Sequence, residues 1–220
     1  MTRRGWGSTL LTFGFLALLI AMLLLFTGSV GTDWRLYHSL QLRYGANEEN
    51  MEALDRALAE YLKGDEGALA AANAFNEREL FHMKDVFDLF VLLRRATAVL
   101  FCCAAAALIA GMRLYGPGRL RAAEKASLRA GCALLLIAGG LGIWGAVDFT
   151  GLFYAFHELL FTNDLWLLDS ATDVLIRICP EGMFRDMALR IAAYTLLFAL
   201  GLPALFAALR KMTGRLLHAL

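Results

Sequence analysis

The chain has 220 residues, of which 59% are hydrophobic and 19% charged, and its net charge is +1. Soluble domains are usually about 45–50% apolar and about 25% charged, so this chain has more apolar material than a soluble domain of its length buries. The near-zero net charge gives no general basic field for nucleic acid. The composition therefore disfavours a soluble nucleic-acid binder and indicates an integral membrane protein that is mostly helical.

Four apolar stretches predict transmembrane helices. No charged residue occurs from Gly5 to Thr32, and uncharged windows follow at 96–112, 130–147 and 191–209. With their apolar flanks, all four can cross roughly 30 Å of hydrocarbon as helices. The first is longer than the core of a signal peptide, so we expect it to be retained. The sequence predicts an all-α integral membrane protein with one domain, 1–220, and spans at about 8–30, 91–113, 130–153 and 188–209.

The third span carries a cluster of four glycines, Gly139, Gly140, Gly142 and Gly145. Small residues let the backbone of a neighbouring helix come close. We therefore expect this cluster to pack against another helix.

The distribution of Lys and Arg predicts the orientation of the spans. Residues 1–7, 113–129 and 210–220 hold ten basic residues and one acidic residue, which gives +9, whereas the remaining segments carry −8. Basic loops stay on the cytoplasmic side. We expect residues 1–7, 114–129 and 210–220 to be cytoplasmic, and two largely helical segments, 31–90 and 154–187, to lie on the extracytoplasmic side.

The first outer segment contains an amphipathic helix between Asn50, which can cap its start, and Gly64, which can end it. Its apolar residues recur at helical spacing: Met51, Leu54, Leu58, Tyr61 and Leu62. We expect a packed cover over the other helices with its acids on the outer side, and a lipid-guiding role is the alternative.

A second helical stretch, 70–93, is expected to run straight into the second span. Within it, Glu79, His82 and Asp85 are spaced by three and lie near one face of the helix. A histidine between two carboxylates can be held in one tautomer and made more basic. A solvated polar face is the alternative. Arg94 and Arg95 follow, where lipid headgroups are their commoner partners.

His157 lies at the outer end of the third span among Phe153, Tyr154, Phe156 and Phe161. An ionisable group in an apolar setting at membrane depth is a candidate functional residue. An interfacial histidine that donates to a backbone carbonyl is the alternative. Further along, Asn163, Trp166 and Asp169 are expected to build a turn and a polar anchor.

His82 and His157 each lie where an outer segment meets a span, and a helical bundle could place both at one depth. Two imidazoles facing one cavity can divide acid and base roles in acyl transfer between oxygen and nitrogen. No GxSxG motif is present, so the nucleophile would belong to the substrate. His38 is expected to be an ordinary interfacial residue. The four cysteines form no CxxC pair and no zinc-binding spacing, which argues against a thiol oxidoreductase and a zinc site.

These residues form two motifs that resemble the lipoprotein intramolecular transacylase family of bacterial membrane proteins. The motifs are Glu79-x-x-His82-Met83-x-Asp85-Val86 and Phe156-His157-x-x-x-Phe161-x-Asn163-Asp164-x-Trp166-x-x-Asp169-x-x-x-Asp173, continued by Leu175, Ile176, Pro180 and Phe184. The second motif is the more specific, and the resemblance covers essentially the whole chain.

The resemblance implies an acyltransferase that moves the sn-2 acyl chain of an S-diacylglyceryl-cysteine lipoprotein to the α-amine of the same cysteine, which leaves a lyso-form lipoprotein. It implies His82 and His157 as the catalytic residues. We expect support from Glu79, Asp85, Tyr154, Asn163, Trp166 and Asp173. No cofactor and no metal is expected. The expected partners are diacylglyceryl-modified lipoproteins and membrane phospholipid, with no nucleic acid, and the expected location is the bacterial cell membrane with the active site facing outward.

Two other functions remain open at this point. A non-enzymatic membrane module for lipid binding or assembly would use both histidines for structural hydrogen bonds. A membrane acyl-ester hydrolase would use the same pair to activate water and would release free fatty acid.

Overall fold

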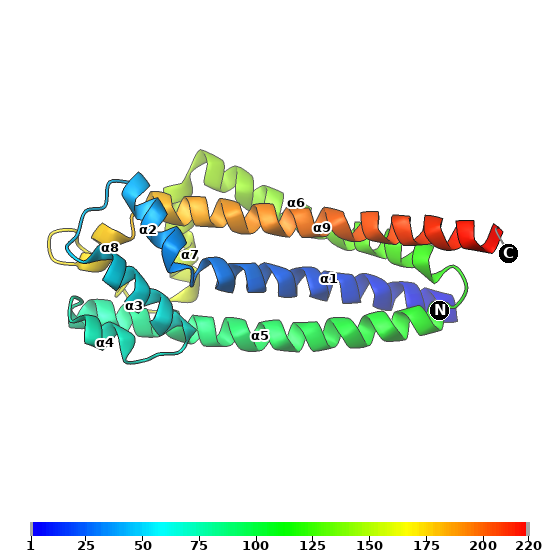
Figure 1. Cartoon of the computed structure of the whole chain (residues 1–220), viewed down its shortest axis with the longest axis horizontal. Coiled ribbons are helices and arrows are strands. Elements are labelled where there is room, and N and C mark those ends of the chain that lie inside the picture. Colours follow the sequence, from blue (N-terminus) through cyan, green and yellow to red (C-terminus); the bar gives the residue numbers. More distant parts are fainter. Residues whose placement is uncertain (1, 219–220) are drawn as a thin grey trace. The chain divides into compact units, whose positions relative to one another are not determined.

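The computed structural model describes residues 2–218 (Figure 1). Met1 and residues 219–220, which belong to the two predicted cytoplasmic ends, lie outside the described residues. The described part of the chain is helical with no strand, and this confirms the all-α prediction. The helices are α1 (Arg3–Val30), α2 (Trp34–Arg43), α3 (Met51–Lys63), α4 (Ala68–Ala72), α5 (Glu77–Tyr115), α6 (Arg119–Val147), α7 (Phe149–Leu160), α8 (Val174–Ile178) and α9 (Glu181–His218).

Four helices of the described chain, α1, α5, α6 and α9, are long and apolar enough to cross a membrane, which confirms the predicted number of spans. Two of them begin well before their apolar parts. The uncharged window of α5 starts at Ala96, so residues 77–95 precede its membrane-crossing part, and α9 starts at Glu181 instead of near residue 188.

The predicted third span, 130–153, ends early. Helix α6 stops at Val147, and Asp148 has a non-helical backbone, with φ of −147° and ψ of 83°. The Asp148 side chain accepts from the backbone N–H of Gly151 at 2.8 Å and so caps α7. A single acidic residue in an apolar run therefore starts a new helix, and that helix carries His157.

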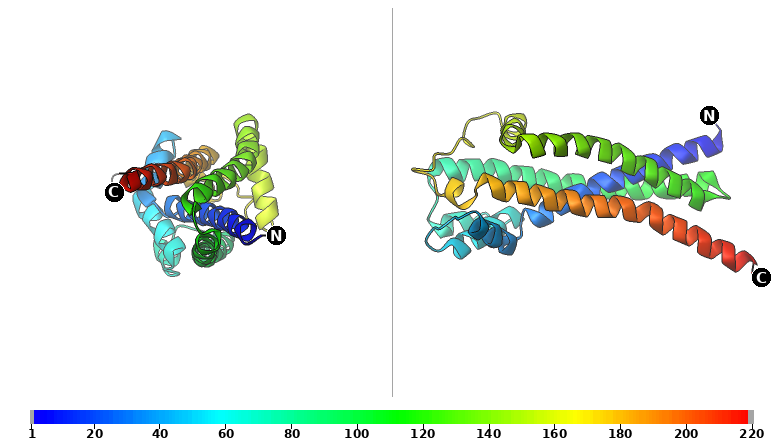
Figure 2. Two further views of the ribbon diagram at one scale, coloured as in Figure 1. Left: turned by 90° about the vertical axis from the view of Figure 1, so that its right-hand side faces the viewer. Right: turned by 90° about the horizontal axis from the view of Figure 1, so that it is seen from above.

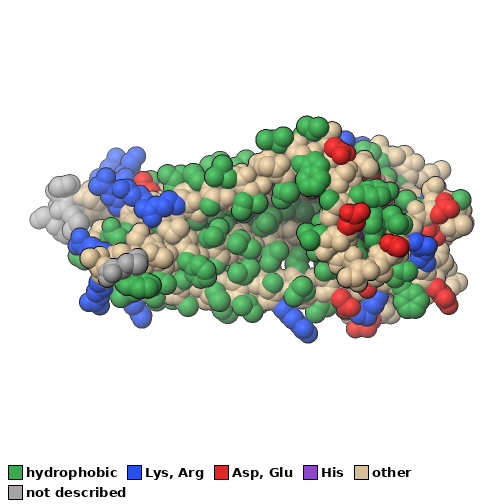
Figure 3. Space-filling view, turned by 180° about the vertical axis from the view of Figure 1, so that it is seen from behind, with side chains coloured by type: hydrophobic (Ala, Val, Ile, Leu, Met, Phe, Trp, Pro, Cys, Tyr) green, Lys and Arg blue, Asp and Glu red, His purple; other side chains and the backbone are tan. Residues whose placement is uncertain are grey.

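The chain forms two compact units. Unit 1 comprises the chain up to Phe26, Arg95–Gly140, and the chain from Ala192 onward; unit 2 comprises Thr27–Arg94 and Leu141–Ile191. On the face that Figure 3 shows, hydrophobic side chains are spread along unit 1, and Lys and Arg gather at the end that holds the turn between α5 and α6. This surface is that of membrane-crossing helices.

In unit 1, α1 packs closely against α5 through glycines. A Cβ atom added to Gly111 would lie 3.0 Å from the backbone nitrogen of Leu11 and 3.1 Å from the carbonyl oxygen of Gly7. The expected glycine cluster of α6 behaves differently, because within the described residues a Cβ added to Gly139, Gly140 or Gly142 would meet no atom within 4 Å. The prediction that this cluster packs against a helix of the chain is therefore wrong for these three positions.

In unit 2, α3 packs against α2 and α4, and Figure 2 shows these three helices together. The apolar face predicted for α3 is buried: Met51, Leu54, Leu58, Tyr61 and Leu62 are all at most 7% exposed. Leu36 and Leu40 of α2, Met83 and Phe87 of α5, and Ile178 of α8 complete this core. Helix α3 is thus a packed cover, as expected.

Three details of this region differ from the predictions. Asn50 precedes α3 with φ of +59° but its side chain makes no capping bond. Asp55 of α3 is fully buried, not outward like the other acids, and pairs with His38 at 3.1 Å. The predicted helix 70–93 is broken between α4 and α5, where Asn73 has φ of +46°.

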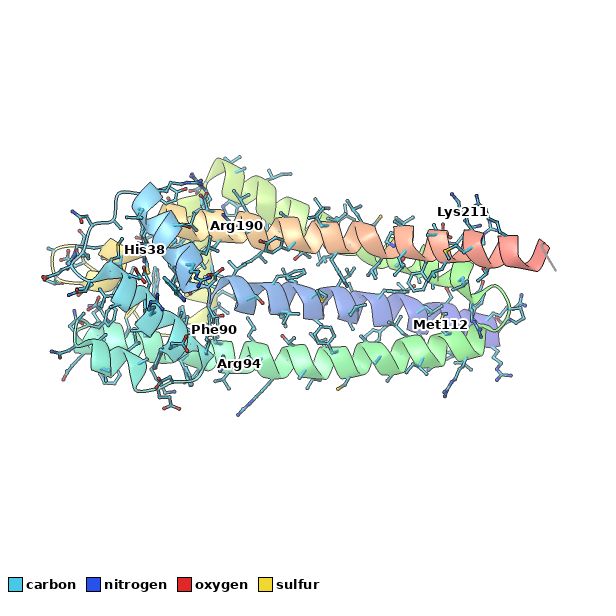
Figure 4. The ribbon with its side chains drawn as sticks, in the orientation of Figure 1. His38, Phe90, Arg94, Met112, Arg190 and Lys211 are labelled. Carbon is cyan, nitrogen blue, oxygen red and sulfur yellow. The ribbon has the colours of Figure 1, made fainter. Side chains whose placement is uncertain are left out.

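Within unit 2, Arg94 of α5 binds the end of α3. Its Nη1 donates to the carbonyl oxygen of Leu62 at 2.6 Å, in the last turn of α3. Figure 4 labels Arg94 and Phe90 on α5 and His38 on α2. A cation at a helix C-terminus satisfies a free carbonyl group and complements the helix dipole.

Replacing Gly111 by Ala should destabilise the protein, whereas Gly139→Ala should not. The first change places a methyl group against the backbone of α1, and such overpacking costs about 1–3 kcal/mol. The second meets open space and gains helix propensity. Thermal unfolding of both variants in one detergent is the measurement; equal melting temperatures would contradict the close α1–α5 packing.

Candidate active site

The structure brings His82 of α5 and His157 of α7 together within unit 2. Their ring centroids are 6.2 Å apart and the ring planes are inclined by 34°. Both side chains are buried, at 7% and 9% exposure. Two residues that are 75 positions apart in sequence therefore share one apolar environment.

A backbone carbonyl fixes the orientation of His157. Its Nδ1 lies 2.7 Å from the carbonyl oxygen of Phe153, one turn earlier in α7. A carbonyl oxygen only accepts hydrogen bonds, so in the neutral imidazole Nδ1 carries the proton and Nε2 keeps its lone pair. The hydrogen bond weighed as a purely structural alternative is present, and it leaves the other ring nitrogen as a base.

Aromatic rings enclose both imidazoles. His157 packs against Phe153, with centroids 4.2 Å apart, and against Trp166, with centroids 4.9 Å apart and ring planes at 30°. Phe161 packs against His82 in a T-shaped arrangement, with ring centroids 5.2 Å apart. Nδ1 of His82 is buried, and it has no hydrogen-bond partner among the described residues.

Burial sets the charge of the pair. It is the largest cause that lowers the pKa of His82 from 6.5 to about 4; the field of His157 acts in the same direction, and Asp85 opposes the shift. Burial also lowers the pKa of His157, against the opposing effect of the Phe153 carbonyl. Both imidazoles are therefore neutral at neutral pH.

Glu79, predicted to support His82, instead joins the starts of two helices. Its Oε2 accepts from the backbone N–H of Asn76 at 2.8 Å, and Asn76 Oδ1 accepts from the N–H of Glu79 at 3.0 Å. This is a capping box at the start of α5. The second oxygen, Oε1, accepts from the N–H of Leu175 at 2.5 Å, in the first turn of α8.

Asp173 extends this network away from the histidines. Its Oδ1 accepts from Asn76 Nδ2 at 2.7 Å and its Oδ2 from the N–H of Asp169 at 2.7 Å. These bonds, led by that of Asp169, lower the pKa of Asp173. Like Glu79, Asp173 fixes the frame in which His82 stands. The pattern Asn76-x-x-Glu79 was the available sequence signal for this capping box.

The remaining predicted residues lie in and around the segment after α7. Asn163 Nδ2 donates to Asp85 Oδ2 at 2.9 Å, so Asp85 holds this segment. Tyr154 packs edge-on against Trp166 with centroids 5.3 Å apart. The structure thus gathers Asp85, Tyr154, Asn163 and Trp166 near the histidine pair.

A pocket of about 320 Å³ adjoins the pair. Phe161 and Trp166 line it and also contact His82 and His157, respectively. Tyr154, Glu158, Asn163 and Asp164 form other parts of its wall. Among the residues that the structure describes, no three His, Cys, Asp or Glu side chains gather as a metal site would require.

Sequence reasoning missed one residue of this region and the identity of one partner. A backbone carbonyl as the acceptor for His157 was weighed as an alternative, but the sequence does not tell which carbonyl accepts, because every residue has one. Arg78, next to Glu79, donates from Nη2 to the carbonyl oxygens of Asp164 at 2.6 Å and Leu167 at 2.9 Å. Its partners are backbone atoms far along the chain, which no local pattern reveals.

Comparison with known proteins agrees with the motifs. The family model described as lipoprotein intramolecular transacylase Lit matches residues 6–184. The in meso structure of that transacylase from Bacillus cereus is 21% identical, with a TM-score of 0.69 over 99% of this chain and 98% of that chain. A histidine-to-alanine variant of the same Bacillus cereus protein is 20% identical, with a TM-score of 0.71 over 96% of both chains. At these identities the two structures establish a shared fold. No curated protein gives a significant match.

The imidazole of His82 should titrate far below the ordinary histidine range. Because its pKa in the folded protein is about 4, it should stay neutral as the pH falls through 6.5. Between these values the unfolded chain binds more protons than the folded one, so the free energy of unfolding should fall with falling pH. NMR of ring-labelled histidine, with His82→Gln for assignment, measures the titration; a midpoint near 6.5 would contradict the buried placement.

Proposed function

The chain belongs to the lipoprotein intramolecular transacylase family, and we propose that it moves the sn-2 acyl chain of an S-diacylglyceryl-cysteine lipoprotein to the α-amine of that same cysteine. The product is a lyso-form lipoprotein with an N-acyl and an S-monoacylglyceryl group. The protein is an acyltransferase and an integral membrane protein.

One observation supports His82 and His157 as the catalytic pair: two neutral, buried imidazoles lie side by side, and one of them is oriented by a carbonyl. The substrate amine must lose a proton while it attacks, and the glyceryl oxygen must gain one as it leaves. A neutral His157 with a free Nε2 can accept the first proton. The protonated imidazole can then deliver it to the leaving oxygen.

The reaction balances without an external acid. The neutral α-amine attacks the ester carbonyl carbon and a C–N bond forms, while its N–H proton passes to Nε2 of His157. The bond from that carbon to the glyceryl oxygen then breaks, and the oxygen takes the proton from His157. Both histidines end in their starting state.

His82 suits a different role from a preformed acid. With a pKa of about 4 it carries no extra proton at neutral pH. A neutral imidazole still offers one ring N–H as a hydrogen-bond donor, and donors aimed at developing negative charge stabilise a tetrahedral intermediate. We therefore assign His157 as the base and then the acid, and His82 as the donor to the carbonyl oxygen.

Two features of the site favour transfer over hydrolysis. Amine and ester belong to one molecule, so holding them together makes the step intramolecular, a large entropic advantage. The aromatic rings around His157 also limit the surface through which water can reach the imidazole. Tyr154 and Trp166 contribute to this wall, whereas Asn163 and Asp85 hold the segment that carries Trp166.

The orientation in the membrane is part of the proposal. We propose that residues 1–7, 114–129 and 210–220 lie in the cytoplasm with both termini, because these segments are rich in Lys and Arg. In the described chain, His82 lies before the apolar part of α5 and His157 lies after α6. The site then faces the extracytoplasmic side, where surrounding phospholipid holds the substrate's acyl chains.

Cells that lack other N-acylating enzymes and express this chain should convert a reporter lipoprotein to its N-acyl isomer, and His82→Ala and His157→Ala should abolish the conversion. The mass of the N-terminal peptide stays constant because one acyl chain only changes position. Mass spectrometry with fragmentation locates that chain on the amine or the glyceryl group.

His218→Ala, at the end of α9, is the matched control and should retain conversion. A peptide that stays diacylglyceryl at full expression of the unaltered chain would contradict the transacylase function. Loss of one acyl mass would instead identify a hydrolase. Full activity in either His82→Ala or His157→Ala would show that the substituted histidine is not catalytic.

A further inference from the structure

Three residues share one face of α5: Arg78, His82 and Asp85 stand at positions i, i+4 and i+7. The outer two bind the segment that follows α7. Arg78 reaches the carbonyl oxygens of Asp164 and Leu167, and Asp85 accepts from Asn163. His82 stands between these two attachments. We refer to residues 163–167 as the strap.

The strap holds an indole ring against the base. In the sequence, Trp166 lies between the two residues whose carbonyl groups Arg78 binds. Its ring packs against His157, with ring centroids 4.9 Å apart. The strap also makes an internal bond, since the N–H of Leu165 donates to Asn163 Oδ1 at 3.1 Å. Together with the bonds to Arg78 and Asp85, this internal bond restricts the movement of the strap backbone.

His157 is fixed from two sides. The Phe153 carbonyl sets which nitrogen carries the proton, but one hydrogen bond leaves the ring free to rock about it. The indole of Trp166 restricts this motion together with the ring of Phe153: their centroids lie 4.9 Å and 4.2 Å from that of His157, and the indole plane is inclined to the imidazole plane by 30°. Accurate placement of a base matters, because a displacement of about 1 Å can lower a rate by about 100-fold.

The guanidinium group of Arg78 suits this task better than another cation would. One nitrogen, Nη2, donates to both carbonyl oxygens, at 2.6 and 2.9 Å, from a planar group with fixed donor directions. A lysine ammonium would keep the charge, but its donors rotate freely on a flexible stem. The contact therefore calls for arginine and not only for a positive charge.

We propose that Arg78 is a positioning residue for acyl transfer: by holding the strap, it keeps Trp166 stacked on His157 and so holds the base Nε2 in line with the substrate amine. This inference rests on the proposed function, because it assigns His157 as the base. Arg78 itself touches no reacting atom.

The test uses the full-length protein with three variants, Arg78→Ala, Arg78→Lys and, as a control, Lys84→Ala. Lys84 is another exposed cation of α5, and its ion-pair partner in the described chain is Asp88, outside the strap. Transfer on a reporter lipoprotein gives kcat and KM separately. NMR of ring-labelled histidine in each variant, with His157→Ala for assignment, reports whether the indole still shields the His157 ring.

Arg78→Ala should lower kcat by about 10- to 100-fold with little change in KM, within the range for a misplaced catalytic group. The His157 ring protons should move downfield as the indole leaves. Arg78→Lys should recover part of both properties, and Lys84→Ala should match the unaltered protein. If Arg78→Ala does not fold, Arg78→Lys replaces it, and both the loss of kcat and the shift of the His157 resonance should then be present but smaller.

Two outcomes would overturn the inference while leaving the proposed function in place. The first is a His157 resonance that does not shift in folded Arg78→Ala or, if that variant does not fold, a resonance without even a partial shift in folded Arg78→Lys. The second is a shifted resonance with unchanged kcat, which makes the strap a structural element only. Activity in His157→Ala would instead show that the proposed site is wrong, whatever Arg78 does.

Discussion

A buried carboxylate fixes the frame of unit 2. Glu79 is 1% exposed and accepts hydrogen bonds from the backbone of Asn76, where α5 begins, and of Leu175, where α8 begins. A buried carboxylate without such partners has a large free-energy cost. Displacement of either helix start would remove a hydrogen-bond donor from Glu79 and is therefore unfavourable. Because the start of α5 is fixed, the face that carries Arg78, His82 and Asp85 is fixed too.

The chemistry of the site depends on a compromise between burial and basicity. Burial among Phe153, Phe161 and Trp166 favours the neutral form of both imidazoles. In the proposed mechanism the same burial weakens His157 as a base, since it lowers the pKa, and the Phe153 carbonyl partly restores basicity. The reaction tolerates a weak base because the nucleophile is intramolecular: an amine already held beside its ester does not need a strong base to activate it.

The sequence predicts those parts of the fold that depend on local patterns. Membrane spans follow from uncharged windows, and the buried face of α3 follows from the spacing of Leu54, Leu58 and Leu62. The breaks at Asn73 and Asp148 were missed because each is decided by a single residue within a favourable helical pattern. Asp55 was placed outward because its charge is visible in the sequence but its partner, His38, lies on another helix.

For the candidate site, too, the sequence predicts what depends on local patterns and misses what depends on distant contacts. His82 and His157 were identified as candidates from ionisable residues in apolar settings and from their motifs. Asp85, Asn163 and Trp166 were expected as supporting residues, but their contacts with one another were not predicted. Glu79 contacts Leu175 and Arg78 contacts Asp164 through backbone groups more than 80 positions away, and no periodicity records such contacts. The capping pattern from Asn76 to Glu79 indicates the helix start but not the second bond to Leu175.

The central claim is that acyl donor and acceptor belong to one lipoprotein molecule. A crossover experiment tests it in vesicles that contain the purified protein and an equal mixture of two lipoproteins, one with both acyl chain and cysteine amine isotopically labelled and one unlabelled. Intramolecular transfer predicts N-terminal peptides that carry both labels or neither. Peptides with a labelled acyl chain on an unlabelled amine, at the frequency expected for random exchange, would contradict the account.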